Sequence, residues 1–280
     1  MQRSDGMNYA PQGKPKPVVG THEFVFAATA LEHGHIYGMC NGLIEAGGTL
    51  KWVYDEDPKK VEAFVKRYPN VQIAKSEQEI LQDANLHLIA AAAIPSERCA
   101  LGLRVMQHEK DYFTDKTPFT SLEQIEAARA AVARTGKKYM VYYSERLHVE
   151  SAVFAGQLIQ DGVIGRVVQV IGLGPHRLNA SSRPDWFFNK AQYGGILCDI
   201  GSHQIEQFLY YAGCSDAHVI SSKVANYHAK DYPELEDFGD ATLLGDNGET
   251  VGRSFSERRD TSNCANISTS LENNLQIICI

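Results

Sequence analysis

The feature that most constrains the fold is a regular alternation of short apolar runs with helical patterns between Glu23 and Tyr143. The apolar runs have the length of strands, and the segments between them carry apolar residues at helical spacing. The expected strands cover residues 23–29, 49–54, 86–93, 112–113 and 139–143. Strands that alternate with helices form a parallel sheet with helices on both faces, because each crossover is right-handed. The sequence therefore predicts a doubly wound α/β domain.

A sheet of this kind binds its ligand at the carboxyl ends of its strands, so the residues that follow each strand are the candidates. Asp55 ends the second strand, where a carboxylate can accept both ribose hydroxyls of an adenosine and repel a 2′-phosphate. This favours NAD over NADP; the alternative is that Asp55 caps the turn at Asp57 and Pro58. The remaining candidates for contact with a dinucleotide are Ala30, His33, Gly34, His35, Ile36, Ile94, Pro95 and Lys116.

The first of these turns departs from the glycine-rich sequence that lets a backbone approach a pyrophosphate. Ala30, Glu32 and His35 stand where glycines are expected, and Glu32 would repel phosphate unless its side chain points away. Gly34 remains, and the following helix offers N–H groups and the positive end of its dipole. His33 and His35 can donate hydrogen bonds to phosphate. As metal ligands they lack a third ligand nearby, so we expect no metal site.

The second half of the chain has a different pattern. A helix is expected over residues 149–160, followed by an apolar strand and then by a buried helix over Leu197–Tyr211. That helix carries Asp199 and His203, which are four residues apart and so share a face. The acid can orient the imidazole or raise its pKa, which gives a general acid–base pair near neutral pH. The alternative, a surface ion pair, is disfavoured by the apolar neighbours.

Three motifs in this chain resemble, in the same order, motifs of the Gfo/Idh/MocA-type oxidoreductases, whose members include glucose–fructose oxidoreductases and inositol dehydrogenases. They are "TDKTPFTSLEQIEAA", "GVIGRV" and "GGILCDIGSHQIEQFLYYAG". In the first, Asp115 replaces the family's Glu and Thr117 is inserted before Pro118. The resemblance covers residues 23–253. It implies a Rossmann domain followed by an α+β domain with a large, open, mostly antiparallel sheet.

The resemblance also implies a nicotinamide cofactor and a sugar, a polyol or a related carbinol as substrate. It places Lys116 near the nicotinamide and the substrate, where a cation stabilises the developing alkoxide. It makes His203, beside Asp199, the base that takes the hydroxyl proton. Taken without the resemblance, Lys116 could be a surface lysine. The substrate-side groups that it implies are Arg146, His176, Arg183 and Trp186.

These patterns divide the chain into an N-terminal arm (1–22), a Rossmann domain (23–146) and an α+β domain (147–280). The arm is rich in Pro, Gly and Lys, and we expect it to be flexible. Residues 254–280 lack the alternation of strands until the last few residues, and the chain is shorter than most members of the family. We therefore expect a truncated or out-of-frame tail and an incomplete second sheet. A homo-oligomer, if the protein forms one, is expected to form through that sheet.

Composition excludes other classes of protein. The formal net charge of −7 and the lack of a basic stripe argue against a nucleic-acid partner. No apolar run approaches the roughly 20 residues of a membrane span. The 44% hydrophobic and 22% charged content is that of a globular protein. The 6 cysteines show no CxxC spacing, which favours reduced core thiols and a cytoplasmic protein.

Three functions compete on this evidence. The first is an NAD(P)-dependent oxidoreductase that transfers hydride between the cofactor and a sugar, a polyol or a related carbinol. The second is an NAD-dependent glycoside-cleaving enzyme of the same fold, which would turn over without net NADH. The third is a non-catalytic nucleotide-binding homologue, which the altered phosphate turn and the short tail keep open. It predicts cofactor binding without substrate-dependent reduction.

Overall fold

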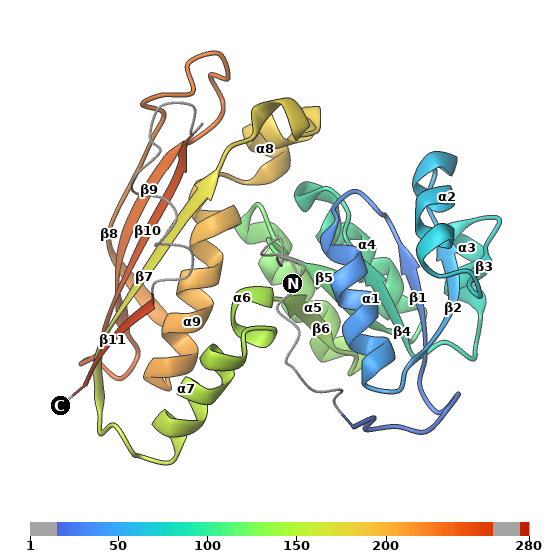
Figure 1. Ribbon diagram of the computed structural model, residues 1–280, viewed down its shortest axis with the longest axis horizontal. Helices are drawn as coiled ribbons and strands as arrows, with labels where there is room; N and C mark the ends of the chain where they lie inside the picture. The colour runs from blue at the N-terminus through green and yellow to red at the C-terminus, as the bar shows by residue number, and fades with distance from the viewer. Residues whose placement is uncertain (1–15, 260–274, 280) are drawn as a thin grey trace, which may run out of the picture. The chain divides into compact units, whose positions relative to one another are not determined.

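The structure is a computed structural model of the chain, and it describes residues 16–259 and 275–279. The described residues divide into two compact units, one ending at Tyr142 and the other beginning at Tyr143. Figure 1 draws both units. Each is built around its own sheet, and each is described below by itself.

The first unit is the expected doubly wound α/β domain. Its described residues form a six-stranded parallel sheet in the order β3-β2-β1-β4-β5-β6. The strands are β1 Val25–Thr29, β2 Thr49–Tyr54, β3 Gln72–Ile73, β4 Leu88–Ala91, β5 Asp111–Asp115 and β6 Tyr139–Tyr142. The helices are α1 His35–Glu45, α2 Pro58–Arg67, α3 Glu77–Gln82, α4 Pro95–Gln107 and α5 Leu122–Thr135. The order reverses between β1 and β4, so a ligand crevice is expected beyond the carboxyl ends of these strands.

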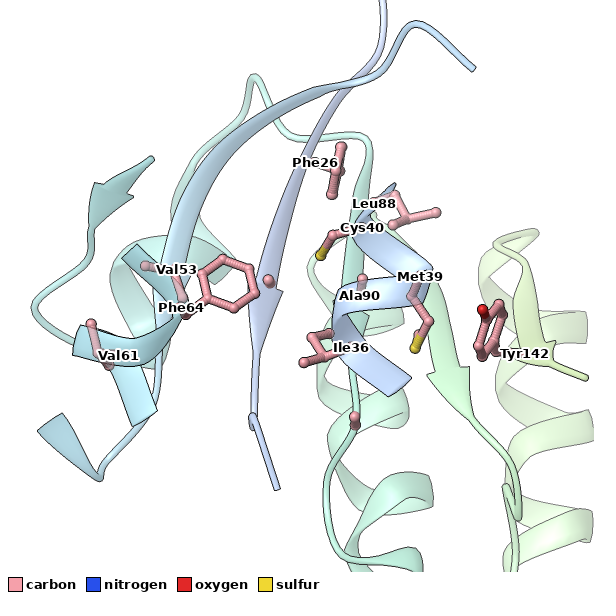
Figure 2. Packing of buried hydrophobic residues seen from close by; sticks show 12 residues of the cluster. Phe26, Ile36, Met39, Cys40, Val53, Val61, Phe64, Leu88, Ala90 and Tyr142 are labelled. Atoms are coloured by element: carbon pink, nitrogen blue, oxygen red, sulfur yellow. The ribbon is translucent and has the colours of Figure 1, made fainter. Parts of the chain in front are cut away.

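Helix α1 is fixed to the sheet by its apolar face. Ile36, Met39 and Cys40 are buried and pack against the strands in the cluster that Figure 2 shows. Gly38 lies on the same helix, and a Cβ atom there would come within 2.5 Å of the Tyr142 hydroxyl. Helix and sheet can therefore approach this closely only with glycine at that position. The packing fixes the position of the amino end of α1 beside the turn that follows β1.

The second unit is built on a mostly antiparallel sheet. Its described residues form a five-stranded sheet in the order β11-β7-β10-β9-β8, in which only the pairing of β7 with β10 is parallel. The strands are β7 Val167–Arg177, β8 Ala217–Ala225, β9 Phe238–Gly245, β10 Val251–Arg259 and β11 Leu275–Cys279. The helices are α6 Ser144–Leu147, α7 Glu150–Gln160, α8 Lys190–Tyr193 and α9 Ser202–Ala212, and a wide π-type turn over Leu197–Gly201 precedes α9.

Helix α9 packs against this sheet through an apolar cluster. Phe208 and Tyr211 of the helix meet Val167 and Val170 of β7 and Leu243 of β9. This packing orients the preceding helical turn and its polar side chains. None of the described helices has both the length and the apolar character that a membrane crossing needs.

The structure corrects the expectation that the strand pattern ends near Arg253. Strand β10 continues to Arg259, and its burial alternates, with Gly252, Ser254, Ser256 and Arg258 facing inward. Burial therefore has the period of two that is typical of a strand. The inward-facing residues are glycine, serine and arginine instead of hydrophobic residues, so the hydrophobic pattern did not reveal the strand. Part of the predicted atypical tail, residues 260–274, lies outside the described residues.

Candidate functional site

The turn between β1 and α1 is held by Asp55 at the end of β2. One carboxylate oxygen accepts a hydrogen bond from the Leu31 N–H at 2.6 Å, and the other accepts one from the Asp57 N–H at 2.9 Å. The helix cap is Asp57, whose side chain accepts the N–H of Lys59. The alternative interpretation is thus confirmed for the turn, where Asp55 accepts the Asp57 N–H, whereas the cap of α2 itself is Asp57. An ionised carboxylate has about four lone-pair positions, so Asp55 retains capacity for ribose hydroxyls.

Glu32, the acid in this turn, is paired with a cation. Its carboxylate forms an ion pair with the ammonium of Lys60 on α2, and that ammonium also lies 4.0 Å from a carboxylate oxygen of Asp55. Partial burial lowers the pKa of Lys60, but the bond to Glu32 and the charges of Asp55, Glu32 and Asp57 raise it overall. The expected repulsion of phosphate by Glu32 is thus reduced, because its charge is compensated from α2.

The turn keeps an open backbone although it lacks the usual glycines. Ala30 has a φ of +51°, the left-handed conformation for which glycine is the usual residue. Gly34 is exposed, and a Cβ atom added there would meet no atom of the described residues within 4 Å. Within residues 16–259 and 275–279, no side chain caps the amino end of α1. The Ala92 carbonyl at the end of β4 accepts the N–H of His33 at 3.1 Å, which ties the turn to the sheet.

The other predicted cofactor residues lie at neighbouring strand ends. Ile36 is buried in the core beneath α1, so it supports the turn from below. Ile94 and Pro95 lie just beyond β4, where they begin α4. The Ile94 carbonyl accepts the Glu97 N–H at 2.8 Å.

Asp115 is buried at the end of β5, where its carboxylate receives donors from four residues. One oxygen lies 3.0 Å from His33 Nδ1 and 3.2 Å from the Arg98 guanidinium. The other lies 2.8 Å from His35 Nδ1 and accepts the Lys116 N–H at 2.8 Å. Burial alone would raise the pKa of Asp115, but the charges of His35, Arg98 and His33 hold it well below its ordinary value. Asp115 is therefore ionised at neutral pH and acts only as an acceptor.

His33 Nδ1 lies 3.0 Å from Asp115 and 3.4 Å from the His35 N–H. Because Asp115 can only accept, the shorter contact favours the hydrogen on Nδ1. Burial, and then the charge of His35, lower the pKa of His33 to about 4, so the ring is neutral at pH 7 and its Nε2 is an acceptor. The hydrogen bond from His33 to phosphate stays a prediction. The described role of His33 is to hold the turn onto β5.

The structure supplies the third ligand that the sequence did not reveal. His33, His35 and Asp115 offer donor atoms that all lie within 4.8 Å of one another, a set that in number and type suits a transition metal. The local charge opposes a cation, however. Arg98 occupies the same carboxylate, Lys116 adds a positive charge, and the amino end of α1 is the positive end of its dipole. We assign the cluster to anchoring the turn, α4 and Lys116 around one carboxylate.

In the second unit, two predicted histidines meet around a carboxylate. His203 of α9 is 3% exposed, and its Nε2 lies 3.9 Å from a carboxylate oxygen of Glu145 on α6. His176 Nε2, from β7, lies 3.6 Å from the same oxygen. The Tyr143 ring meets the His203 ring edge-on, with centroids 5.7 Å apart. Sequence reasoning missed Glu145, although its position directly after a strand of the parallel sheet was a usable signal.

Asp199 has a partner that was not foreseen. Its carboxylate forms an ion pair with Arg258 of β10, whose guanidinium lies over the rings of Phe187, at 4.3 Å, and Tyr193, at 5.5 Å. Asp199 lies in the wide π-type turn that precedes α9, where the prediction assumed an unbroken α-helix. The pairing of Asp199 with His203 stays a prediction. Burial lowers the pKa of Arg258 to about 9, so it remains cationic at neutral pH.

Arg146, predicted on the substrate side, is engaged in packing. Its Nε donates to both carboxylate oxygens of Glu206, at 2.7 and 3.0 Å. Its guanidinium lies 4.0 Å from the centroid of the Tyr210 ring. These contacts join α6 to α9. They account for the position of Arg146 without a ligand.

Arg183 and Trp186 lie in the loop after β7, beside Phe187. The Arg183 guanidinium donates to the Leu178 carbonyl at 2.9 Å and lies 4.5 Å from the centroid of the Phe187 ring. Burial lowers the pKa of Arg183. The indole N–H of Trp186 is buried and has no hydrogen-bond partner within the described part of the chain. A buried donor in that state is a candidate for contact with a ligand.

Comparison with known proteins gives two family matches, one for each half of the chain. Residues 19–143 match the oxidoreductase family with an NAD-binding Rossmann fold. Residues 153–275 match the GFO/IDH/MocA C-terminal domain. Together these matches cover most of the chain.

Individual relatives agree with this result. A crystal structure of a proposed oxidoreductase from Erwinia carotovora atroseptica is 48% identical, with a TM-score of 0.86, over 92% of this chain and 76% of that chain. The WlbA dehydrogenase from Bordetella pertussis, in complex with NADH and UDP-GlcNAcA, shares the fold at 17% identity and a TM-score of 0.74, over 93% of this chain and 72% of that chain. A D-xylose dehydrogenase of Paenarthrobacter nicotinovorans is 23% identical over 51% of this chain. That match spans 38% of the length of this curated relative.

Proposed function

This chain belongs to the Gfo/Idh/MocA oxidoreductase family, with an NAD-binding Rossmann fold, and on that premise we propose that it is an NAD-dependent dehydrogenase of sugars or polyols. The observation that carries the proposal is a buried imidazole, His203, beside the carboxylate of Glu145 in the unit that follows the Rossmann unit. An imidazole oriented by a carboxylate is suited to take a proton from a hydroxyl group near neutral pH. The relatives named above are a D-xylose dehydrogenase and an enzyme in complex with a nucleotide sugar acid, which supports a sugar as the substrate.

The residues of the first unit fit a dinucleotide. The turn after β1 is open at Gly34, no side chain of the described part of the chain caps α1, and Asp55 retains acceptor positions. Asp55 would take the ribose hydroxyls, and the turn from Ala30 to Gly34 would face the phosphates. Ile94 and Pro95, which begin α4 beyond β4, would line the same crevice. When bound, NAD supplies the hydride acceptor.

The protein's own residues would handle the proton and the charge. We assign to His203 the removal of the hydroxyl proton, with Glu145 stabilising the imidazolium that results. Lys116 would stabilise the developing alkoxide through its positive charge. Its main chain is held by Asp115, which makes the cluster around Asp115 a positioning device for this lysine.

Three polar groups of the second unit suit the remaining hydroxyls of a sugar. The indole N–H of Trp186 and one guanidinium nitrogen of Arg258 are buried and lack a partner among the described residues. His176 shares the carboxylate of Glu145 with His203. A buried donor without a partner gains a hydrogen bond when a hydroxyl group enters, which favours a polar ligand over an apolar one.

Two broader properties are also part of the proposal. Strand β8 is at the edge of the sheet, and Val219 and Ile220 there are 62% and 61% exposed. An exposed apolar face of this kind supports a homo-oligomer formed through the second sheet, which light scattering would test. The free thiols of Cys40, Cys99 and Cys214 are buried, which supports a cytoplasmic protein with reduced cysteines.

The proposal is tested by following NADH absorbance with a panel of aldoses, inositols and other polyols. We expect substrate-dependent NADH formation with at least one member of the panel. Turnover of a glycoside without net NADH would favour the glycoside-cleaving enzyme. Binding of NAD without reduction by any substrate would favour the non-catalytic homologue. Either of these two results would overturn the dehydrogenase assignment.

A further inference from the structure

The ion pair between Glu32 and Lys60 joins the phosphate turn to α2 at the end of β2. Glu32 is 28% exposed and Lys60 is 29% exposed, so the pair is partly shielded from water. The same ammonium lies 4.0 Å from the carboxylate of Asp55, the residue assigned to the ribose hydroxyls. Lys60 is therefore the cation beside the position that a 2′-phosphate of NADP would occupy, and Glu32 already neutralises it.

We propose that Glu32 selects NAD over NADP by neutralising the charge of Lys60 beside the position of a 2′-phosphate. The inference deepens the proposed function and rests on it. A phosphate ester brings a charge of about −1.5 to −2 at pH 7. At the end of β2 it would meet the carboxylates of Asp55, Asp57 and Glu32, while the charge of Lys60 is compensated. NAD brings no such charge, so its binding does not require the pair to break.

Glu32 is separable from Asp55 as a determinant. Asp55 accepts the N–H groups of Leu31 and Asp57, so its replacement would disturb the turn as well as the reading of the ribose. The polar contact described for the Glu32 side chain is the one with Lys60. Replacing Glu32 with glutamine therefore changes the local charge and keeps the shape of the side chain.

The test is calorimetric titration of the full chain with NAD and with NADP. For Glu32→Gln we expect the Kd for NADP to fall at least about fivefold, which corresponds to roughly 1 kcal/mol, while the Kd for NAD stays within about twofold. The gain should shrink as ionic strength rises, because it comes from a partly exposed charge. Adding Lys60→Met to this variant should abolish the gain. The matched control is Glu62→Gln. Glu62 lies on α2, the helix that carries Lys60, but it pairs with Lys66 at the surface.

The outcomes separate this inference from the proposed function. If the unmodified chain binds neither dinucleotide, the proposed function fails and the inference fails with it. If NAD binds and Glu32→Gln leaves the NADP-to-NAD ratio of Kd values unchanged, only the inference is overturned. A gain that persists when Lys60 is replaced would also overturn it, because the effect would not act through that lysine. Thermal denaturation of each variant checks that it is folded.

Discussion

Each unit of this protein buries a carboxylate against an arginine, and the two pairs differ in how fully their polar atoms are used. Asp115 with Arg98 lies in the first unit, and Asp199 with Arg258 lies in the second. Asp115 receives donors from two histidines, an arginine and a backbone N–H. Arg258 instead has a guanidinium nitrogen without a partner among the described residues.

The difference separates an anchor from a binding group. A buried carboxylate whose oxygens are all satisfied rigidifies what surrounds it, and it gains nothing from a ligand. A buried donor that lacks a partner is costly until a ligand supplies one. The first pair therefore belongs to the scaffold that presents Lys116 and the phosphate turn. The second pair belongs to the surface that we expect to contact substrate.

The largest effect on stability should come from Asp115→Asn. The change leaves Arg98 buried without its counter-ion and weakens the contacts of both histidines, so we expect a loss of about 3–5 kcal/mol in the free energy of unfolding. Urea denaturation measures it. The control is Glu62→Gln, whose carboxylate is 68% exposed and should contribute within about 0.5 kcal/mol. A loss below about 1 kcal/mol for Asp115→Asn would contradict the role of anchor.

Acid should destabilise the protein through His33. The pKa of His33 is about 4 in the folded protein, below its ordinary value of 6.5, so between these values the unfolded chain binds the proton first. Stability should therefore fall as pH is lowered from about 6.5 to 4, and the dependence on His33 should end below 4. The ring is 26% exposed, so we expect less than the roughly 3 kcal/mol of the full shift.

His33→Gln provides the check on this pH dependence. Unfolding experiments at several pH values should show a smaller slope for the variant across that window. Asp115 contributes in the same direction but at lower pH, because its pKa is held below the ordinary carboxyl range. If the pH dependence of the free energy of unfolding is unchanged in His33→Gln, His33 does not contribute to the acid sensitivity of the cluster around Asp115.

Replacement of Arg258 should affect substrate more than cofactor. For Arg258→Gln we expect the KM for the sugar to rise about tenfold, because a charged hydrogen bond to a hydroxyl group is worth about 1.5–3 kcal/mol. The Kd for NAD should stay within about twofold. Steady-state kinetics and calorimetry measure the two quantities separately. If NAD binding weakens as much as the KM rises, Arg258 has a structural role like that of Arg98. The two ion pairs would then not differ in function.

The smallest effect is expected at Trp186. Trp186→Phe removes the indole N–H and keeps an aromatic ring, so we expect the KM for the sugar to rise about three- to fivefold, the value of one neutral hydrogen bond. Thermal denaturation should show little change, since that N–H has no partner among the described residues to lose. A large fall in thermal stability would indicate a packing role and no contact with substrate.

The sequence predicted much of the fold because apolar spacing reports packing directly. The five strands predicted for the first unit begin and end within a few residues of the predicted ranges, and β2 over Thr49–Tyr54 agrees at both ends. Strand β3, Gln72–Ile73, was not predicted. Asp55 was expected at the end of β2 and lies there. Its two backbone partners were not expected, because turn geometry decides which N–H groups a carboxylate receives.

The site was harder to predict from the sequence, because its paired residues come from segments that are far apart in the chain. Arg98, Glu145 and Arg258 each complete a pair with a residue at least 17 positions away, and spacing says nothing about such pairs. One signal was present: Arg98 is a charged residue in a mostly apolar helical segment. The wide π-type turn that holds Asp199 was not predicted, since helical periodicity does not reveal such a turn.

The central claim is that His203 removes the hydroxyl proton while the first unit holds the cofactor. The most direct test compares the chain with its His203→Gln variant in single-turnover formation of NADH, with NAD binding measured in parallel. We predict a rate about 10²- to 10⁴-fold lower in the variant, with the Kd for NAD within about twofold. A variant that binds NAD normally and forms NADH at an undiminished rate would contradict the claim.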